Sequence, residues 1–197
     1  MESTIEKLSD EDLMSRLAKG DHQAFCVLVR RHTQRFYGCA YRICLHENDA
    51  EDVVQDCFLK LWDRPALWQK GQGAKFTTWF YRVVSNRALD IVRKRQCAER
   101  TGGDELDAAA SGDVGQEGML QITQEQKALE AALSELSERQ RQALNLCFYD
   151  GFSNKEAAEI MGLGVKALES LLMRAKNALR EKMIKQGLIE EEKNYGS

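Results

Sequence analysis

Residues 153–180 have the sequence SNKEAAEIMGLGVKALESLLMRAKNALR, which predicts two helices joined by a tight glycine turn. Ser153 and Glu156 have the spacing of a capping box, so the first helix is expected to begin there. Gly162 and Gly164 permit the sharp bend that follows it. This layout is that of a helix-turn-helix, a motif that places its second helix in the major groove of DNA.

The second helix of this motif has two different faces. Its predicted buried face carries apolar residues at helical spacing: Val165, Leu168, Leu172, Ala175 and Leu179. The DNA-facing set comprises Lys155, Val165, Lys166, Glu169, Ser170, Met173, Arg174 and Asn177. The alternative is a plain helical hairpin whose polar face is only solvated. The capping box, the two glycines and the small Ala157–Ala158 pair together favour the DNA-binding interpretation.

Composition and charge limit the class of protein. The 197 residues are 43% hydrophobic and 30% charged, with a single proline, which suits compact helical domains. The net charge of −3 argues at first against nucleic acid, but it divides unevenly: +3 over residues 1–97, −6 over 98–126 and 0 over 127–197. Neither a membrane-spanning run nor a signal-peptide core is present in the sequence, so we expect a cytoplasmic protein without membrane insertion.

The chain divides into two helical domains and a connector. Residues 1–97 and 127–197 carry helical patterns throughout, whereas residues 98–126 are dominated by glycine, alanine and acid and predict a flexible linker. The sequence therefore predicts an all-α fold of two small domains joined by a flexible acidic linker, with the helix-turn-helix in the second. The expected helices are Asp10–Lys19, one capped by Asp21, one beginning at Asn48, one beginning at Thr77 or Thr78, 124–134, 138–150 and the helix-turn-helix pair.

The third predicted helix carries an acidic stripe opposite its apolar face. Val53, Val54, Cys57, Phe58, Leu61 and Trp62 form the expected core side, and Asp52, Gln55, Asp56, Leu59 and Asp63 form the other. An acidic stripe with an exposed leucine suits docking to a basic partner helix. Taken alone, such a stripe is equally typical of a solvated helix face.

The fourth predicted helix has the opposite charge. Its expected outer side carries Arg82, Asn86, Leu89 and Arg93, with Trp79 at the edge, and the loop Trp68–Phe76 before it contains two lysines. Basic groups interleaved with aromatic rings suit single-stranded nucleic acid, because bases stack on the rings while cations follow the phosphates. Most of these aromatic residues are also compatible with a core position, but we expect Trp79 to be partly exposed.

Cysteines and histidines give no catalytic or metal-binding pattern. The six cysteines lack metal-finger spacing, and those on apolar stripes, Cys26, Cys39, Cys57 and Cys147, are expected to be buried reduced thiols. His22 and Cys26 lie one helical turn apart, but an ordinary structural role is favoured. We predict no catalytic residue, metal or cofactor, and hence no enzyme. Cys97, at the domain boundary, remains open as an exposed reactive thiol.

Three segments together resemble the extracytoplasmic-function (ECF) sigma factors of bacterial RNA polymerase. Residues 49–62, DAEDVVQDCFLKLW, resemble the segment of that family that binds the polymerase clamp. Residues 76–95, FTTWFYRVVSNRALDIVRKR, resemble its promoter-melting helix, and residues 133–182 resemble its upstream-element reader. All three occur in the family's order and spacing, with the linker in the place of its variable connector.

The resemblance implies specific contacts. Core polymerase would be bound, at its β′ clamp helices, by Asp49, Asp52, Gln55, Asp56, Leu59 and Asp63, with the β flap as a second contact. The minus-ten promoter element would be held by Lys70, Lys75, Phe76, Trp79, Arg82, Asn86 and Arg93, Asn86 contacting an extruded base. The helix-turn-helix would bind the minus-thirty-five element. An anti-sigma factor is a further expected partner, and the free chain is expected to be a monomer.

The sequence leaves two questions open. At Glu169 the family more often has a basic or neutral residue, so this glutamate either accepts from a cytosine amino group or lies off the interface. The alternative function is a stand-alone helix-turn-helix transcriptional regulator, which predicts a homodimer on palindromic half-sites. A redox or metal sensor using the cysteines is less well supported, because the thiol spacing is absent.

Overall fold

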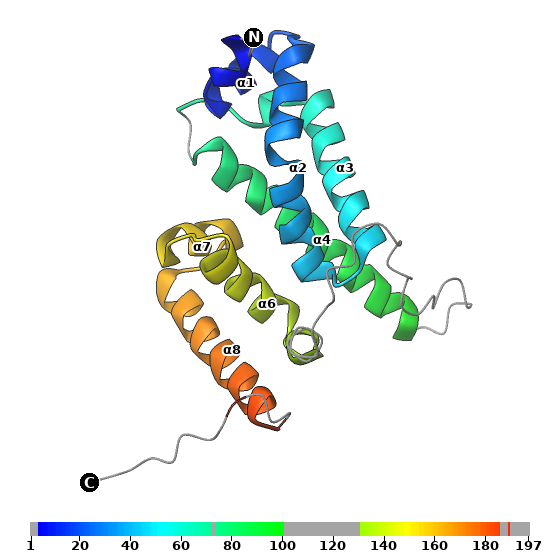
Figure 1. Cartoon of the computed structure of the whole chain (residues 1–197), viewed down its shortest axis with the longest axis vertical. Helices are drawn as coiled ribbons and strands as arrows, with labels where there is room; N and C mark the ends of the chain where they lie inside the picture. The colour runs from blue at the N-terminus through cyan, green and yellow to red at the C-terminus, as the bar shows by residue number, and fades with distance from the viewer. Residues whose placement is uncertain (1–3, 72–73, 101–130, 186–188, 190–197) are drawn as a thin grey trace.

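The computed structural model describes residues 4–71, 74–100, 131–185 and 189. Within these ranges the chain is built from helices without a strand, which confirms the all-α prediction (Figure 1). None of the helices in this part of the chain combines the length and apolar character needed to cross a membrane. Most of the predicted linker and the first part of the predicted helix 124–134 lie outside the described residues.

The front domain is a bundle of four α-helices. Short 3₁₀ turns, η1 (Thr4–Lys7) and η2 (Pro65–Leu67), accompany α1 (Asp10–Leu17), α2 (His22–Cys44), α3 (Glu47–Asp63) and α4 (Phe76–Arg100). The Asp21 carboxylate caps α2 as predicted, accepting from two backbone N–H groups. The N-cap of α3 is His46 rather than Asn48, and α4 begins at Phe76. Helix α4 also continues to Arg100, three residues into the predicted linker.

The second domain contains the predicted helix-turn-helix. It comprises α6 (Glu138–Leu144), the π-helical turn η3 (Asn145–Tyr149), α7 (Asn154–Met161) and α8 (Val165–Lys185). The capping box at Ser153 and Glu156 is present, as is the one at Ser137 and Gln140. Gly162 ends α7 in the left-handed region with φ +63°, a conformation that glycine adopts without steric cost.

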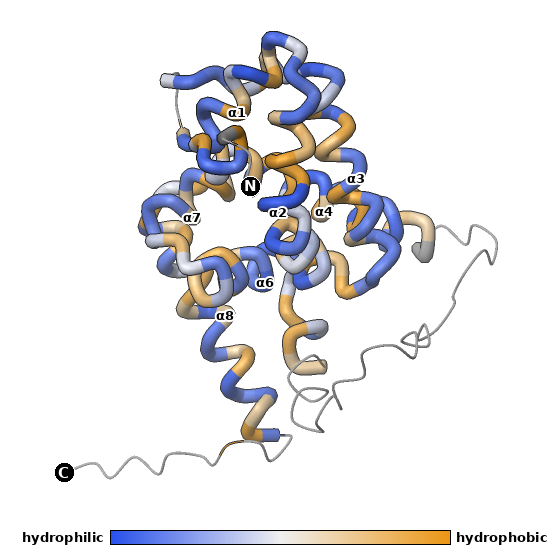
Figure 2. Tube along the Cα trace, turned by 45° about the horizontal axis from the view of Figure 1, so that its top comes forward, coloured by the Kyte–Doolittle hydropathy of each residue, from blue (hydrophilic) through white to orange (hydrophobic). Residues whose placement is uncertain are grey.

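Aromatic rings fill the centre of the front domain. Phe36, Phe76, Phe80 and Tyr81 are fully buried. The ring of Phe36 lies 4.7 Å from that of Phe80 and 5.0 Å from that of Tyr81, and the rings of Phe76 and Phe80 lie 5.4 Å apart, between centroids. Such edge-to-face and stacked pairs add to the free energy of burial. Figure 2 shows hydrophobic residues recurring at intervals along the helices of the front domain. The core that positions the candidate surfaces is therefore well defined.

Four expected positions within the helices are wrong. Leu89, expected on the outer side of α4, is buried. Val165 was expected on the buried face as well as in the DNA-facing set; it is 40% exposed, so only its buried placement is wrong. Trp62 is 37% exposed, because it packs at the rim of the bundle against the rings of His22 and Phe25. Cys26 is exposed rather than buried. Cys39 and Cys57 are buried as predicted, and Cys147 is half-buried.

The two domains pack against each other. Helix α7 lies beside the first half of α4, and α6 with η3 lies against α2 (Figure 1). The buried residues of both domains form one continuous hydrophobic cluster. The described residues of the two domains therefore form a closed arrangement.

Candidate functional site

The acidic surface on α3 consists of Asp49, Asp52, Gln55, Asp56, Leu59 and Asp63. Asp52, Gln55 and Asp63 are exposed, and the Leu59 side chain is 58% exposed despite being apolar. Helix α3 has this composition on one side because its opposite side, from Ala50 to Leu61, is committed to the core. The predicted stripe thus lies on the surface, and its leucine is available for contact.

Two members of the acidic surface are held by α4. The Asp56 carboxylate accepts from Arg87 Nε at 3.0 Å and from Arg87 Nη2 at 2.5 Å. Asp49 accepts from Arg95 Nη1 at 2.8 Å. Neither arginine was predicted as a partner, because no local spacing signals a partner on another helix. Asp52 forms no ion pair with any residue that the structure describes, so its charge is the more available one.

A groove runs beside the acidic surface between α2 and α3. Its volume is about 630 Å³, and its walls are mainly apolar, with Phe25 and Val29 from α2 facing Val54, Phe58 and Leu59 from α3. Apolar grooves of this kind accept the apolar face of an amphipathic helix. The sequence signal that could have revealed it is the apolar Phe25–Val29 pair, one turn apart on α2.

The basic surface of the front domain consists of Lys70, Lys75, Trp79, Arg82, Asn86 and Arg93. All its polar members are exposed and Trp79 is half-buried, as expected. Phe76 was predicted to contact DNA, and this is wrong: its ring is fully buried against Phe80 and Trp68 in the aromatic core. Arg93 also lies 3.9 Å from Glu138 of α6, across the domain boundary.

A small recess opens beside Trp79. It has a volume of about 200 Å³ and is lined by Ala66, Leu67, Trp68, Gln69, Ala74 and Trp79. Trp68 is buried, and its indole N–H donates to the Ala74 carbonyl oxygen at 3.1 Å, which fixes one wall. The recess combines an aromatic ring with polar groups and adjoins the exposed Lys75.

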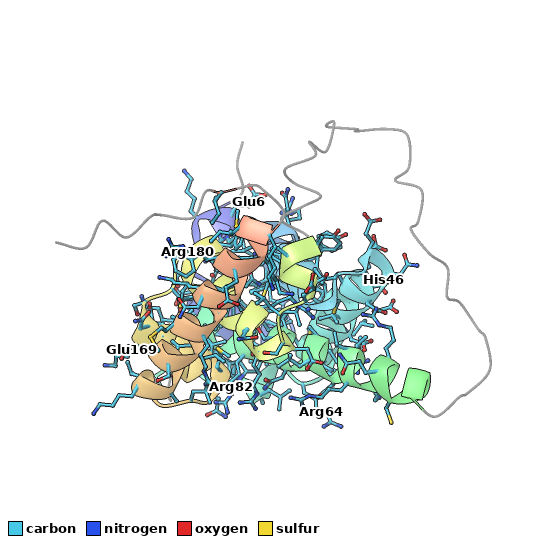
Figure 3. The ribbon with its side chains drawn as sticks, turned by 90° about the horizontal axis from the view of Figure 1, so that it is seen from below. Glu6, His46, Arg64, Arg82, Glu169 and Arg180 are labelled. Carbon is cyan, nitrogen blue, oxygen red and sulfur yellow. The ribbon has the colours of Figure 1, made fainter. Side chains whose placement is uncertain are left out.

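The second helix of the helix-turn-helix presents an exposed face. Val165, Lys166, Glu169, Ser170, Met173, Arg174 and Asn177 of α8 are all exposed, as is Lys155 of α7. In Figure 3, Glu169 projects outward at the rim of the molecule, as does Arg82 of α4. Leu168, Leu172 and Ala175 hold the opposite side of α8 in the core. Glu169 is therefore sterically able to reach a base edge.

Comparison with known proteins matches both domains to families. The Sigma-70 region 2 family matches residues 28–97, and the Sigma-70, region 4 family matches residues 126–179. The chain is 34% identical over 173 residues to RNA polymerase sigma factor NccH of Alcaligenes xylosoxydans xylosoxydans, covering 86% of this chain and 92% of NccH. It is 30% identical over 186 residues to the ECF RNA polymerase sigma-E factor of Escherichia coli K12, covering 90% and 96%.

A solved sigma factor structure also resembles this chain. The structure of CnrH in complex with the cytosolic domain of CnrY has a TM-score of 0.66 and 27% identity, covering 89% of this chain and 97% of CnrH. These matches span both domains in one order, which favours the sigma-factor interpretation over a stand-alone regulator. The chain therefore belongs to the extracytoplasmic-function group of RNA polymerase sigma factors, alternative sigma factors that direct the polymerase to promoters.

Proposed function

We propose that three separate surfaces of this sigma factor divide the work of promoter recognition. The acidic surface of α3 binds the polymerase clamp helices, the basic surface of α4 holds the opened minus-ten element, and α8 binds the minus-thirty-five element. The observation that carries this proposal is that all three surfaces are exposed on different helices, each backed by the common core. The chain breaks no bond itself, since the polymerase is the enzyme, and it works in the cytoplasm beside it.

Polymerase docking combines charge with apolar contact. Asp52 and Asp63 attract a basic partner helix, while the exposed Leu59 and the adjoining groove offer apolar area to bury. Charge steers the encounter and sets its orientation, whereas burial of apolar surface supplies affinity. This combination of charge and apolar area supports α3 as the element that binds the polymerase clamp. The β flap of the polymerase is the proposed contact of the second domain.

Minus-ten binding follows from the recess beside Trp79. A base turned out of the DNA stack can enter a small pocket with an aromatic wall, and cations such as Lys75 and Arg82 can follow the backbone. Unstacking a base costs a few kcal/mol, which stacking and hydrogen bonds in the pocket offset. Asn86 lies two turns beyond Trp79 on α4, and its amide can both donate to and accept from a base edge.

Minus-thirty-five binding assigns the exposed face of α8 to the major groove. Lys166 and Arg174 can contact phosphates or guanine, and Glu169 can accept a hydrogen bond from a cytosine amino group. Ser170 donates to the Lys166 carbonyl oxygen at 2.9 Å, so its hydroxyl is partly committed within the helix. Arg174 Nε also donates within the helix, to the Ser170 carbonyl oxygen at 3.3 Å, but its guanidinium has further N–H donors. We therefore assign base selection mainly to Glu169 and Arg174.

An anti-sigma protein completes the proposed partners. CnrH was solved with the cytosolic domain of CnrY, and the sigma factor RpoE of Bartonella quintana, whose structure shares this fold, was solved with the anti-sigma factor NepR. We expect a regulator of this class to cover the polymerase-docking surface of α3 and the groove beside it. The free chain is expected to be a monomer.

Forked promoter DNA and core polymerase test the proposed division. Asp52→Lys should weaken assembly with the polymerase, whereas Asn86→Ala should leave assembly intact and weaken binding of the single-stranded minus-ten segment. Glu169→Gln should change preference at one base pair of the minus-thirty-five element. Glu159→Gln, an exposed glutamate on α7, is the matched control and should change nothing. Unchanged base preference in Glu169→Gln would remove Glu169 from the DNA interface.

A further inference from the structure

A pocket lined by arginines lies where the end of α4 meets the start of α6. Its volume is about 500 Å³, and its charged lining among the described residues consists of Arg93 from α4 and Glu138, Arg139 and Arg141 from α6. Three guanidinium groups against one carboxylate leave this arginine pocket with an excess of positive charge. Only Arg93 belongs to a surface described above, so promoter recognition does not explain the pocket.

Arg141 is a buried cation that forms no ion pair with any residue that the structure describes. It is only 8% exposed, and its Nε is buried without a hydrogen-bond partner. Its Nη1 donates to the Ser134 and Leu136 carbonyl oxygens, both at 3.0 Å, and its Nη2 to the Ile43 carbonyl oxygen at 3.2 Å. These oxygens accept hydrogen bonds but carry no net charge, and burial lowers the pKa of the guanidinium. Because a buried charge is costly without a counter-charge, an anion in the pocket would be stabilising.

The other two arginines of the pocket are weakly committed. Arg139 is exposed, and its guanidinium forms no ion pair or hydrogen bond within the described part of the chain. Arg93 lies 3.9 Å from each of two carboxylates, Asp90 and Glu138, and such loose pairs at the surface contribute little. Both guanidinium groups are therefore available to a ligand. Glu138 is the group that opposes an anion, because it lines the pocket and attracts Arg93.

Phosphate groups match this set of donors. A guanidinium presents parallel N–H groups that pair with two phosphate oxygens at once, and a hollow lined by one sign of charge concentrates ions of the opposite sign. The volume of about 500 Å³ lies within the range of small-molecule sites and has room for more than one phosphate group. A nucleic acid backbone fits less well, because protein covers almost all of the Arg141 side chain.

We propose that the arginine pocket binds a small anion with two or more negative charges on phosphate groups: a pyrophosphate unit, either free or as part of a nucleotide. Arg139 and Arg93 contact the phosphate oxygens, and the buried charge of Arg141 adds to the attraction. Glu138 opposes the anion and so sets the affinity. The site gives this sigma factor a small-molecule ligand in addition to polymerase and DNA, and it does not depend on the DNA contacts proposed above.

Calorimetric titration of the free full-length chain with inorganic pyrophosphate, at constant ionic strength, tests the site. The parent should bind a single equivalent with a Kd below about 1 mM. Arg139→Gln should raise the Kd at least about tenfold, because it removes charge-assisted hydrogen bonds to phosphate. Arg139 is varied because Arg93 is also assigned to DNA and Arg141 holds three carbonyl oxygens of the fold. Glu138→Gln should lower the Kd by about threefold or more, since the competing carboxylate is lost, and a variant that only disturbs the fold would not bind more tightly.

The matched control is Arg64→Gln, which removes the same charge from another exposed arginine. The end of α4 lies at the start of α3, where Arg95 pairs with Asp49, whereas Arg64 follows the opposite end of α3. Arg64→Gln should leave the Kd within about twofold of the parent value, because salt screens exposed charges that far apart.

ATP in place of pyrophosphate shows whether a nucleoside adds affinity, and either result supports the site if Arg139→Gln weakens both ligands. Absence of saturable pyrophosphate binding by the parent, or equal losses in Arg139→Gln and Arg64→Gln, would overturn the proposal. So would binding of a single-stranded oligonucleotide that depends on Arg139 in a chain that does not bind pyrophosphate, because the pocket would then belong to nucleic acid.

Discussion

The Asp56 carboxylate on α3 receives two hydrogen bonds from the Arg87 guanidinium on α4, whereas its neighbour Asp52 is exposed one turn earlier. The Asp56–Arg87 ion pair therefore has a structural role between α3 and α4, in addition to any role of Asp56 in docking. Asp52 forms no ion pair with any described residue, so its charge is more available to a partner. The two residues should therefore respond differently to the same substitution.

Asp52→Asn is expected to weaken polymerase binding more than Asp56→Asn does. Asp56→Asn should instead lower the free energy of unfolding by about 0.5–1 kcal/mol, the range for a half-exposed ion pair, while Asp52→Asn should leave it unchanged. Urea unfolding and titration with core polymerase measure the two effects. Equal losses of affinity in both variants would contradict the distinction.

Two aromatic residues of α4 should separate folding from DNA binding. Phe76→Ala removes a fully buried ring and should lower the free energy of unfolding by about 3–5 kcal/mol. Trp79→Ala removes a half-buried ring beside the recess, and should weaken binding of single-stranded minus-ten DNA by about 1–3 kcal/mol. Thermal unfolding and DNA titration of the assembled polymerase are the measurements. A stable Phe76→Ala variant with impaired DNA binding would show instead that Phe76 contacts DNA.

Asp10 should make the front domain sensitive to acid. Burial alone raises the pKa of its carboxyl, but hydrogen bonds and charge from His32 and Arg31 together lower the pKa below its ordinary value of 3.8. The ionised form therefore stabilises the fold above that value, and the contribution is lost as pH falls through the lowered pKa.

Asp10→Asn should accordingly reduce the free energy of unfolding at about pH 7 by roughly 1.5–3 kcal/mol, and by less at about pH 3. Urea unfolding at both pH values checks this. A difference between parent and variant that does not shrink in acid would show that the Asp10 charge is not the source.

The cysteines should react with a thiol reagent in a graded order. Cys26 and Cys97 are exposed and should react first, and the half-buried Cys147, whose pKa is raised by burial, should follow. Burial raises the pKa of Cys39, Cys44 and Cys57 to about 12, so these thiols should react only on unfolding. Peptide mass mapping over time gives the order. Early modification of Cys39 would contradict this order and indicate that the core of the front domain opens readily.

Local signals predicted the helices and their caps well. Ser153 with Glu156, Asp21 at α2 and the Gly162 turn each depend on residues a few positions apart, and the structure contains all three. Leu89 was misplaced for a physical reason. Projection of one helix assumes a single buried face, but α4 is packed by α1, α2, α3 and α7, so its buried arc is wider.

Contacts between distant segments could not be predicted. Asp56 and Arg87 lie 31 residues apart, and Arg42 and Asp150 lie 108 residues apart. No period or motif in one chain links such positions, because only the packed fold brings them together. The sequence accordingly identified the exposed candidate surfaces on α3 and α8, but not the arginines behind the acidic surface or the contact between Arg42 and Asp150.

Run-off transcription with core polymerase over a randomised promoter pool tests the central assignment most directly. The parent chain should select promoters with two conserved elements. The Asp52→Lys/Asp56→Lys variant should produce at least about tenfold less transcript, because it reverses the charge that docks the polymerase. Full activity of that double variant, or transcripts without any selected upstream and downstream element, would contradict the account.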